Sequence, residues 1–599
     1  SSLSALYLDD DSQKISMKEK FSKSKLKKDG TEGKASVLPD TVELQMNPDT
    51  RQAWIEYSCL DVVATWRLRE CLATKLTALP WGRNDAGNMM DFYNNYFLPF
   101  GELLTDIERE GIFIDLELLK KAEAQAEKDK AAAQEKFIKW VTKLMPDGKY
   151  INPSSTKQKQ QLFFGPYKDL IPAEAEFPRV NVEGVIEPGK KKPLVSTKFT
   201  LKGLGATPDS SHVTPTGLPQ VNTPVLRALA GYPPNKYGTL YDHFGQSKEG
   251  EEACEAVDAL LTTLAIDTML GTFICPLQEH ADSNNRIHCG LNLNTATGRL
   301  SAKRPNLQNQ PALEKDTYKV RAAFRAPEGK TLIVADYGQL ELRLLAHISN
   351  CKSMLEAFRL GGDFHSRTAL GMYSHIQEAL NDKKVLLEWD KSAGEAPAPL
   401  IKDVYASERR KAKTLNFSIA YGKTANGLSG DWGVSLAEAK DTLNLWFADR
   451  PEVRLWQENT KMYAELTGYT RTLMGRTRPI PECKSAQRHM VSRGHRMAIN
   501  TPVQGGAADV VIMAMLKIHR NKRLRELGYK IILQVHDEII CEGPKDSVEE
   551  ALAIVKHCME FPFNDHDGVK EDNFNPVNCN MLVELAVDAN SADTWYEAK

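Results

Sequence analysis

Two distant parts of the chain each combine a short apolar run with an acidic residue. The run Leu332–Ala335 is apolar and partly β-branched, which predicts a buried strand, and Asp336 follows it. Residues 529–543, YKIILQVHDEIICEG, hold two apolar runs around Asp537 and Glu538, which predict a β-hairpin with an acidic turn. A purely structural hairpin turn usually carries Gly or Asn, so the acidic residues favour a functional role.

A helix between these two parts carries cations and aromatic rings on one face. In SERRKAKTLNFSIAYG, residues 407–422, every fourth position from Arg409 holds Lys413, Phe417 and then Tyr421, so the four side chains share a face. Ser407 is the expected N-cap. The cations would suit the phosphates of a nucleoside triphosphate, and the rings its base and sugar. An ordinary amphipathic helix with solvated cations and core aromatics explains the segment equally well on its own.

The remaining hydrophobic pattern predicts a mostly helical chain with irregular stretches. Helical periodicity covers residues 54–79, 92–145 and 251–280, and another helix begins at Leu340. Ile287, Leu291 and Leu293 alternate as in a strand. Residues 146–250 are expected to be loops with short elements, and 385–405 to be an insertion between helices. Residues 8–36 carry eight lysines without apolar periodicity, which predicts a solvated loop.

Length and composition add few constraints. The 599 residues suggest two to four domains, while 42% hydrophobic and 26% charged residues are typical of a globular protein. No apolar run approaches the roughly 18 residues expected of a membrane span. The net charge of −2 means that any nucleic-acid binding must use locally clustered Lys and Arg. Ten cysteines without a CxxC pair argue against a zinc site or a disulfide framework.

The acidic segments and the cationic helix together suggest nucleotidyl transfer. Buried carboxylates are costly unless a cation neutralises them. Mg²⁺ held by few protein carboxylates usually carries substrate phosphates. Two metals about 3.5–4 Å apart stabilise the attacking and leaving oxygens of phosphoryl transfer.

In this order, the three segments resemble motifs A, B and C of family A DNA polymerases, the bacterial DNA polymerase I family. Four further segments resemble parts of the same family: IEREGIFID, NTATGRLSAKRPNLQNQP, GDFHSRTA and RMAINTPVQGGAADV. The resemblance covers roughly residues 85–599. It implies an α+β right-hand fold with an antiparallel palm sheet and helical fingers and thumb. The implied regions are thumb 86–285, palm 286–349, fingers 350–478 and palm 479–599, after a partial RNase H-like 3′–5′ exonuclease segment at 1–85.

The resemblance implies roles for individual residues. Asp336 and Asp537 would bind two Mg²⁺ ions, with Glu538 beside them as a further catalytic candidate. Lys413 would stabilise the triphosphate and could protonate the pyrophosphate leaving group. The other nucleotide-binding residues would be Arg409, His365, Gln339, Glu341, Phe417 and Tyr421. The DNA-binding residues would be Arg299, Asn309, Arg496, Asn500, Gln504 and His536.

Two of these residues imply sugar selection. Glu341 would pack against C2′ of the sugar and exclude a ribose hydroxyl, so that dNTPs are chosen. Phe417 stands where some relatives have Tyr, and without a phenolic hydroxyl it should disfavour dideoxynucleotides.

The N-terminal segment YSCLDVVATWRL resembles the third motif of a 3′–5′ exonuclease, with Tyr57 and Asp61 in the metal-site roles. The other exonuclease motifs are not found in residues 1–56, so we expect no proofreading by this polypeptide.

Several departures from the bacterial pattern favour the plant and protist organellar enzymes. Gly338 and Leu340 replace the common Ser and Ile of motif A, and residues 165–215 and 385–405 resemble insertions into thumb and fingers. We expect a monomer in the mitochondrion or plastid, its targeting segment removed or upstream. The expected partners are primer-template DNA and dNTPs, with an organellar helicase and a single-strand-binding protein, and no membrane.

Two other functions share parts of this pattern. A single-subunit RNA polymerase has the same three motifs, but a carboxylate at Glu341 would obstruct the 2′-hydroxyl that it must admit. A catalytically silent DNA-binding subunit could keep the fold, but it would have no need for both aspartates and Lys413.

Overall fold

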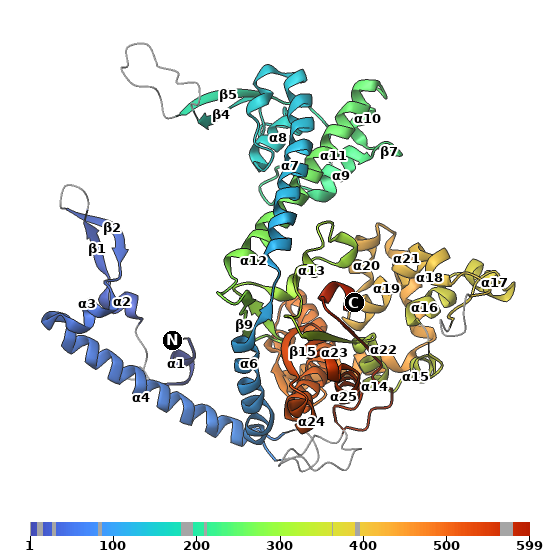
Figure 1. Cartoon of the computed structure of the whole chain (residues 1–599). Helices are drawn as coiled ribbons and strands as arrows, with labels where there is room; N and C mark the ends of the chain where they lie inside the picture. Colours follow the sequence, from blue (N-terminus) through green and yellow to red (C-terminus); the bar gives the residue numbers. More distant parts are fainter. Residues whose placement is uncertain are drawn as a thin grey trace.

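A four-stranded antiparallel sheet lies at the centre of the fold. The computed structural model describes residues 2–8, 16–26, 31–81, 87–180, 196–208, 212–361, 363–389, 396–563 and 579–599 (Figure 1). The strand order of the sheet is β14 (Lys530–Val535), β15 (Glu538–Pro544), β11 (Lys330–Tyr337) and β16 (Val587–Ala592). The predicted strand at Leu332–Ala335 and the predicted hairpin are therefore confirmed.

Both faces of β14, β15 and β11 are buried, which explains why these three strands are largely apolar, whereas the edge strand β16 is mostly polar and more exposed. Ile333 and Ala335 of β11 face a cluster formed with α23 (Arg488–Arg520) and α25 (Val548–Glu560). Leu332 and Val334 face the opposite cluster, which includes α13 (Val320–Ala323) and α26 (Trp595–Ala598). Each fully buried aliphatic side chain of this kind contributes about 1.5–3 kcal/mol.

The long helix α23 crosses the sheet with a proline inside it. Pro502 has no N–H, so the carbonyl of Ala498 loses its helical donor. The Thr470 hydroxyl of β12 (Tyr469–Arg471) donates to that carbonyl at 3.4 Å. A neighbouring element thereby satisfies the acceptor, and the helix continues through the proline.

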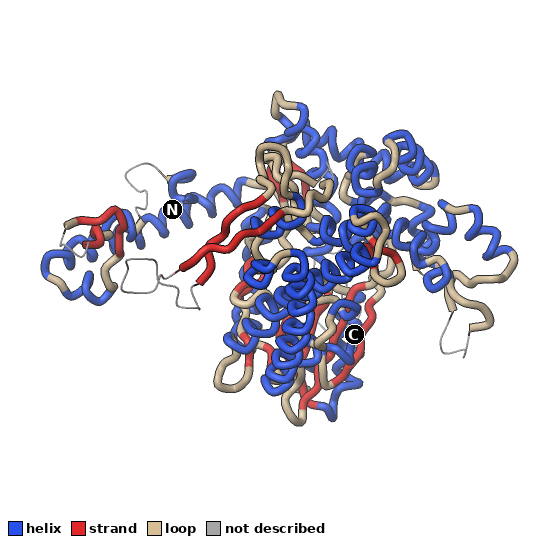
Figure 2. The backbone as a smooth tube through the Cα atoms, turned by 90° about the horizontal axis from the view of Figure 1, so that it is seen from above, coloured by secondary structure: helices blue, strands red, loops and turns tan. Residues whose placement is uncertain are grey.

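An elongated helical arm, residues 112–279, extends away from the sheet (Figure 1), whereas α6 (Leu98–Glu110) before it packs against the sheet. The long helices of the arm are α7 (Leu116–Leu144) and α11 (Lys248–Met269), and both lie where the periodicity predicted helices, as does α6. A hairpin of β4 (Glu174–Val180) and β5 (Ser196–Lys202) projects from the arm (Figure 2). It lies within the predicted insertion 165–215, of which 181–195 and 209–211 are outside the described residues. The smaller elements of the arm are β3 (Ile112–Phe113), η3 (Pro146–Tyr150), α8 (Thr156–Phe164), α9 (Thr223–Ala230), β6 (Gly231–Tyr232), β7 (Lys236–Tyr237), α10 (Thr239–His243), η4 (Leu270–Ile274) and α12 (Cys275–Glu279).

One helical stretch of the arm is long and apolar enough to cross a bilayer by length and composition. It covers Lys248–Glu279, whereas no membrane span was predicted from the sequence. Its buried side chains pack into the cores that it shares with α7 and α9. A core helix passes the same test, so the stretch is weak evidence for a membrane span.

A helical lobe, residues 352–448, lies on the other side of the sheet (Figure 1). It is built from α15 (Lys352–Arg359), α16 (Phe364–Met372), α17 (Ser374–Asn381), α18 (Ile401–Val404), α19 (Ala406–Ala420), α20 (Ala425–Trp432) and α21 (Leu436–Ala448). In the predicted insertion 385–405, Leu386 pairs with Leu400, and residues 390–395 are outside the described part. The helix α22 (Pro451–Thr467) leads from the lobe to β12 and packs against β12 and α23.

Short elements complete the region around the sheet. The predicted strand at Ile287–Leu293 is two strands, β8 (Arg286–Ile287) and β9 (Gly290–Asn292), which pair with β3 and β10 (Ser301–Lys303) respectively. The others are η5 (Leu307–Asn309), η6 (Leu313–Lys315), α14 (Leu340–Ser349), β13 (Thr477–Pro479), η8 (Pro481–Lys484), α24 (Lys522–Glu526) and η9 (Lys545–Ser547).

The N-terminal region is more structured than its composition predicted. Residues 16–26 and 31–37 form α2 (Met17–Phe21) and a hairpin of β1 (Lys23–Leu26) with β2 (Glu32–Val37), so the predicted loop at 8–36 is wrong there. Residues 9–15 and 27–30 lie outside the described part. Lysines on short elements remain solvated, so composition did not distinguish a hairpin from a loop. The other elements are α1 (Ser2–Tyr7), α3 (Thr41–Met46), α4 (Pro48–Ala78), α5 (Met89–Phe92) and η2 (Tyr93–Phe97).

Candidate active site

Strand pairing brings Asp336 and Asp537 to the same end of the sheet. Asp336 lies opposite Glu538 in the β11–β15 register, and His536 and Asp537 form the tight turn between β14 and β15. The backbone N–H of Tyr337 donates to the Asp537 carbonyl at 3.3 Å. The turn needs a left-handed residue, and His536 supplies it with a φ of 56°. Such a conformation in a bulky residue at a tight turn is typical of a functional site.

Burial makes both aspartates costly to ionise without a cation. It raises the pKa of Asp537 to about 6, and the nearby Glu341 and Asp336 carboxylates act in the same direction. Burial also raises the pKa of Asp336. A basic side chain lies near each aspartate: Arg299 is 3.5 Å from Asp537 Oδ1, and Lys599 is 3.7 Å from Asp336 Oδ2.

Glu538 is held more tightly than the two aspartates. Its carboxylate is 1% exposed and accepts hydrogen bonds from Trp595 Nε1 and Lys599 Nζ, both near the end of the chain. Glu538 therefore supports the wall of the site and does not point freely into it.

A hydrogen-bonded chain links the sheet to the helical lobe. Arg299 donates to one oxygen of the buried Glu341, and the Tyr421 hydroxyl donates to the other. Burial and the Glu341 charge raise the pKa of Tyr421, so the hydroxyl remains a donor. Glu341 is therefore fixed in position between Arg299 and the aromatic face of α19.

A buried ion pair supports the loop that carries Arg299. Arg476 donates to Asp509 at 2.6 Å and to the Thr297 and Gly505 carbonyls at 3.0 Å each. Gly298 has a φ of 86°, and a Cβ at that position would collide with the Arg476 guanidinium. Only glycine therefore fits between Thr297 and Arg299.

The predicted face of α19 is present, but its two cations differ. Arg409 makes two hydrogen bonds to Asp363, at 2.6 and 3.0 Å. Burial alone would raise the pKa of Asp363, but the Arg409 and Ser366 hydrogen bonds outweigh it and lower the pKa. Lys413 is exposed and has no ion pair or hydrogen bond in the described part of the chain. The rings of Phe417 and Tyr421 lie 6.1 Å apart.

The predicted N-cap of this helix is wrong. The cap is Tyr405, whose carbonyl accepts the Arg409 N–H at 2.9 Å, and Ser407 lies inside the first turn. The Ser407 hydroxyl donates to Glu408. The helix begins earlier because α18 leads into α19 across one residue.

Of the other two predicted phosphate contacts, His365 packs against this face, with its ring 5.7 Å from that of Phe417. His365 is 3% exposed, and burial lowers its pKa to about 4. Gln339, with a φ of 57°, immediately precedes α14. Its Oε1 is buried without a hydrogen-bond partner in the described structure.

The predicted DNA-binding residues fall into two groups. Arg496, Asn309 and His536 are exposed, whereas Arg299, Asn500 and Gln504 are partly buried. Arg299 Nε and Asn500 Oδ1 are buried atoms without a partner among the described residues. Buried polar atoms are normally paired, so these atoms indicate a place for a polar ligand or water.

Few protein side chains at this site could bind a metal ion. Across the described ranges, no group of three or more His, Cys, Asp and Glu side chains is arranged to hold a metal ion. Mg²⁺ is commonly bound by one or two carboxylates together with substrate phosphates, so Asp336 and Asp537 fit that ion better than a closed structural site.

The exonuclease candidates lie apart from this site. Tyr57 is on α4 and packs its ring against Phe21 and Trp54, at centroid distances of 5.6 and 6.1 Å. Asp61 follows one helical turn later. The structure therefore gives Tyr57 a core role, and the two residues do not join the carboxylates of the sheet.

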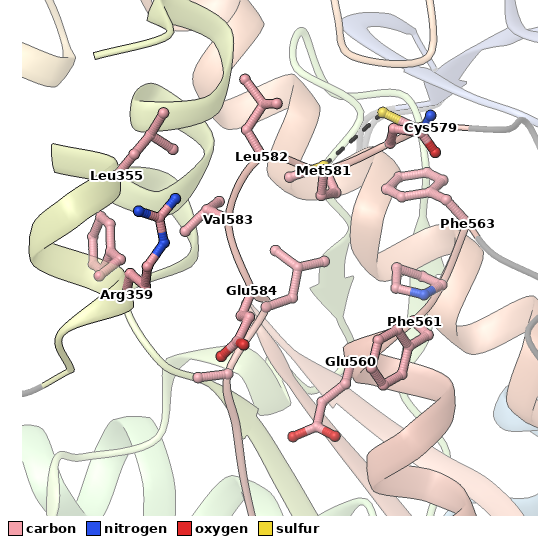
Figure 3. A pocket seen from close by; sticks show the side chains of 15 residues that line it. Leu355, Arg359, Glu560, Phe561, Phe563, Cys579, Met581, Leu582, Val583 and Glu584 are labelled. Atoms are coloured by element: carbon pink, nitrogen blue, oxygen red, sulfur yellow. Dashed lines mark hydrogen bonds between the residues drawn. The ribbon is translucent and has the colours of Figure 1, made fainter. Parts of the chain in front are cut away.

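A separate cavity of about 650 Å³ lies between α15, the end of α25 and the chain that leads to β16 (Figure 3). Its lining includes Leu355, Phe561 and Glu584, and none of the predicted site residues.

Sequence reasoning missed the residues that support the site. Asp363 could have been found from its spacing to Ser366, which is typical of a helix N-cap. Lys599, Trp595, Arg476 and Asp509 gave no local signal, because each acts through a contact distant in sequence.

Comparison with known proteins identifies the family. The sequence profile of DNA polymerase family A matches residues 239–384 and 390–597. DNA polymerase I A, chloroplastic/mitochondrial, of Arabidopsis thaliana is 47% identical over 640 aligned residues, covering 98% of this chain and 59% of that protein. DNA polymerase I B, mitochondrial, of Oryza sativa subsp. japonica is 46% identical, covering 98% of this chain and 60% of that protein. The chain thus spans about three fifths of the length of these relatives.

A solved structure shares the fold. The POL domain of Pol1 from M. smegmatis, in complex with DNA primer-template and dNTP, has a TM-score of 0.66 and 25% identity, covering 90% of this chain and 75% of that one. The resemblance predicted from the motifs is confirmed: the chain belongs to DNA polymerase family A.

Proposed function

We propose that this chain performs template-directed DNA synthesis, adding dNTPs to a primer 3′-hydroxyl with release of pyrophosphate. The observation that carries the proposal is the pair Asp336 and Asp537, brought to one end of the sheet by strand pairing and linked to Tyr421 at the end of α19 through Arg299 and Glu341. Membership of the family supports the same activity, as do the primer-template DNA and dNTP bound to the related mycobacterial domain.

Asp336 and Asp537 would hold two Mg²⁺ ions. When bound, these ions would supply charge stabilisation for the attacking and leaving oxygens of an in-line displacement. The high pKa of Asp537, about 6 because of burial, means that a bound cation would also keep this carboxylate ionised.

Residues of α19 and α16 would bind the triphosphate. Lys413 is exposed with its ammonium unpaired within the described part, so it is available to a phosphate and could donate a proton to the leaving group. Arg409 would reach the outer phosphates by exchanging its hydrogen bonds to Asp363. His365 and Gln339 would complete the contacts to the phosphates.

Glu341 and the minor-groove residues would select the substrate. Glu341 is 5% exposed and fixed by two partners, so it cannot move aside for a ribose hydroxyl without breaking them. Arg299, Asn500 and Gln504 would hydrogen-bond to acceptors common to all base pairs, and would thereby test the geometry of pairing.

Primer extension tests the proposal. Asp336→Asn should reduce single-nucleotide incorporation by more than about 10³-fold, because a neutral amide is a poor ligand for Mg²⁺. Asp546→Asn is the matched control, because Asp546 is exposed at the opposite end of the β11–β15 pair. Wild-type levels of incorporation by Asp336→Asn would overturn the assignment.

The choice between dNTPs and rNTPs separates this proposal from an RNA polymerase. Wild-type protein should prefer dNTPs, and Glu341→Ala should raise rNTP incorporation relative to dNTP incorporation. A wild-type preference for rNTPs would favour the RNA polymerase. DNA binding without incorporation of either would favour a catalytically silent subunit.

The cellular setting is also proposed from the relatives, whose names place them in chloroplasts and mitochondria. Synthesis on organellar DNA, with a helicase and a single-strand-binding protein as partners, would follow from this location. Residues 1–85 would be the remnant of a 3′–5′ exonuclease domain, supported by the sequence around Tyr57 and Asp61. Fractionation of organelles containing the tagged full-length protein tests the location.

A further inference from the structure

A fully buried amide lies behind His365 in the helical lobe. Asn416 of α19 is 0% exposed, and it contacts residues of α16 and α21. Its Oδ1 accepts from Trp446 Nε1 at 2.9 Å, and its Nδ2 lies 3.1 Å from His365 Nδ1 and 3.0 Å from Thr368 Oγ1.

The chemistry of these groups fixes which way each hydrogen bond points. An indole N–H can only donate, so the Asn416 oxygen must face Trp446. The amide nitrogen must then face His365, and it too can only donate. His365 Nδ1 must therefore be an acceptor, which leaves the single proton of the neutral ring on Nε2.

The second proton of the amide is also satisfied. Thr368 Oγ1 donates to the Phe364 carbonyl at 3.0 Å, which leaves an oxygen lone pair to accept from Asn416 Nδ2. Both amide protons and the amide oxygen therefore have partners. A fully satisfied buried network of this kind holds its members in one arrangement.

We propose that Asn416 is a positioning residue that holds His365 as the neutral Nε2–H tautomer, so that this nitrogen donates a hydrogen bond to the dNTP phosphates. The inference rests on the proposed function for its substrate. Trp446 is the second member of the device, because it fixes the orientation of the amide.

The surroundings of His365 agree with a neutral donor. Burial lowers the pKa of His365 to about 4, so the ring is neutral at physiological pH. The charges that act on it are Asp363 at the start of its own helix, and Arg409 and Lys413 on α19. No charged group that the structure describes on α15 or α17, the other helices against α16, contributes to its pKa shift. The two neighbouring cations would attract the triphosphate by their charge. The neutral N–H of His365 would orient it through a directional hydrogen bond.

Asn416→Asp tests the device with almost no change of shape. The new carboxylate still accepts from Trp446, but it offers His365 Nδ1 an acceptor in place of a donor. The pKa of His365 should rise, and above that pKa the remaining proton should lie on Nδ1. Nε2 would then present a lone pair to the phosphates and repel them.

The equilibrium Kd of dNTP is measured in the complex with primer-template DNA, from pH 6 to pH 9. At each pH, the Kd of the variant is divided by the Kd of the wild type. We expect this ratio to rise at least tenfold across the range for Asn416→Asp, and to lose its pH dependence in Asn416→Asp combined with His365→Gln. A ratio that is raised equally at every pH would overturn the proposal and leave Asn416 a purely structural role. Thr414→Asp is the control for added charge, because Thr414 is exposed on the same helix and its ratio should stay flat.

A second measurement needs neither substrate nor a folded Asn416 variant. Nitrogen NMR of wild-type protein with labelled histidine, with the His365 signal identified by its loss in His365→Gln, should give the Nε2–H pattern at pH 7.5. Trp446→Phe, which removes the indole donor, should introduce the Nδ1–H pattern. An Nδ1–H pattern in the wild-type protein would overturn the inference. An Nε2–H pattern in a protein that does not bind dNTP would contradict only the proposed function.

Discussion

The carboxylates of the central sheet and the cations of α19, which the proposed function assigns to one site, are held differently by the fold. Asp537 and Asp336 are positioned by strand register, and a basic side chain lies within 4 Å of each. Lys413 is exposed on its helix and has no such partner in the described structure, while Arg409 is engaged with Asp363. The sheet side is therefore preformed, whereas on the helix side Arg409 would have to exchange Asp363 for a phosphate under the proposed function.

This difference follows from what each side must do. Carboxylates that converge on metal ions repel one another, so only a rigid framework keeps them together. Under the proposed function, the cations of α19 would instead have to release the product pyrophosphate, and an exposed or exchangeable cation does so more readily than a buried one. The fold is therefore most rigid around the carboxylates of the sheet, where like charges lie close together.

The rigid side can be broken most strongly through its buried ion pair. Asp509 is 0% exposed, and it holds Arg476 beneath the loop that carries Arg299. Asp509→Ala should destabilise the protein by roughly 3–5 kcal/mol, because it leaves the arginine charge buried and unpaired. Denaturant unfolding measures the loss. Asp546→Asn, at an exposed position, should change stability by less than about 0.5 kcal/mol, and equal effects of the two variants would contradict a supporting role for Asp509.

The helix side should fail in a different way. Lys413→Ala should leave stability unchanged, because Lys413 supports no other residue in the described structure. It should reduce kcat/KM for dNTP incorporation by roughly 10²-fold, the usual cost of losing a group that stabilises a developing charge. Lys411→Ala is the control, since Lys411 is exposed on the same helix outside the Arg409–Tyr421 face. A comparable loss in both variants would mean that only general positive charge matters.

These two sides also differ in how far the sequence predicted them. The strand at Leu332–Ala335, the hairpin and the face of α19 depend on local periodicity, and all are present. The partners of those residues could not be predicted in the same way. Lys599 reaches Glu538, and Trp446 reaches Asn416, only after distant segments have packed. The Ser407 cap failed for a related reason, because α18 set the start of the helix.

Phe417 tests whether the aromatic face of α19 contacts the sugar. Phe417→Tyr should lower discrimination against dideoxynucleotides by about tenfold or more, because a hydroxyl can replace the hydrogen bond of the missing 3′-OH. Competition between dNTP and ddNTP in primer extension gives the ratio. Tyr421→Phe should bring no such gain, because its hydroxyl bonds to Glu341. Unchanged discrimination in Phe417→Tyr would remove Phe417 from the sugar site.

The smallest effect concerns the exchange of partners by Arg409. Asp363→Asn keeps a good N-cap on α16, since Asn and Asp cap equally well, but it removes the charge that holds Arg409. The freed guanidinium should lower KM for dNTP by about threefold, because binding no longer has to break a charge-assisted pair. Ser366→Ala is the matched control: it removes a different hydrogen bond to Asp363, at 2.5 Å, and leaves the arginine in place. If KM instead rises in Asp363→Asn, the carboxylate is needed to aim Arg409, and the helix side would be as preorganised as the sheet.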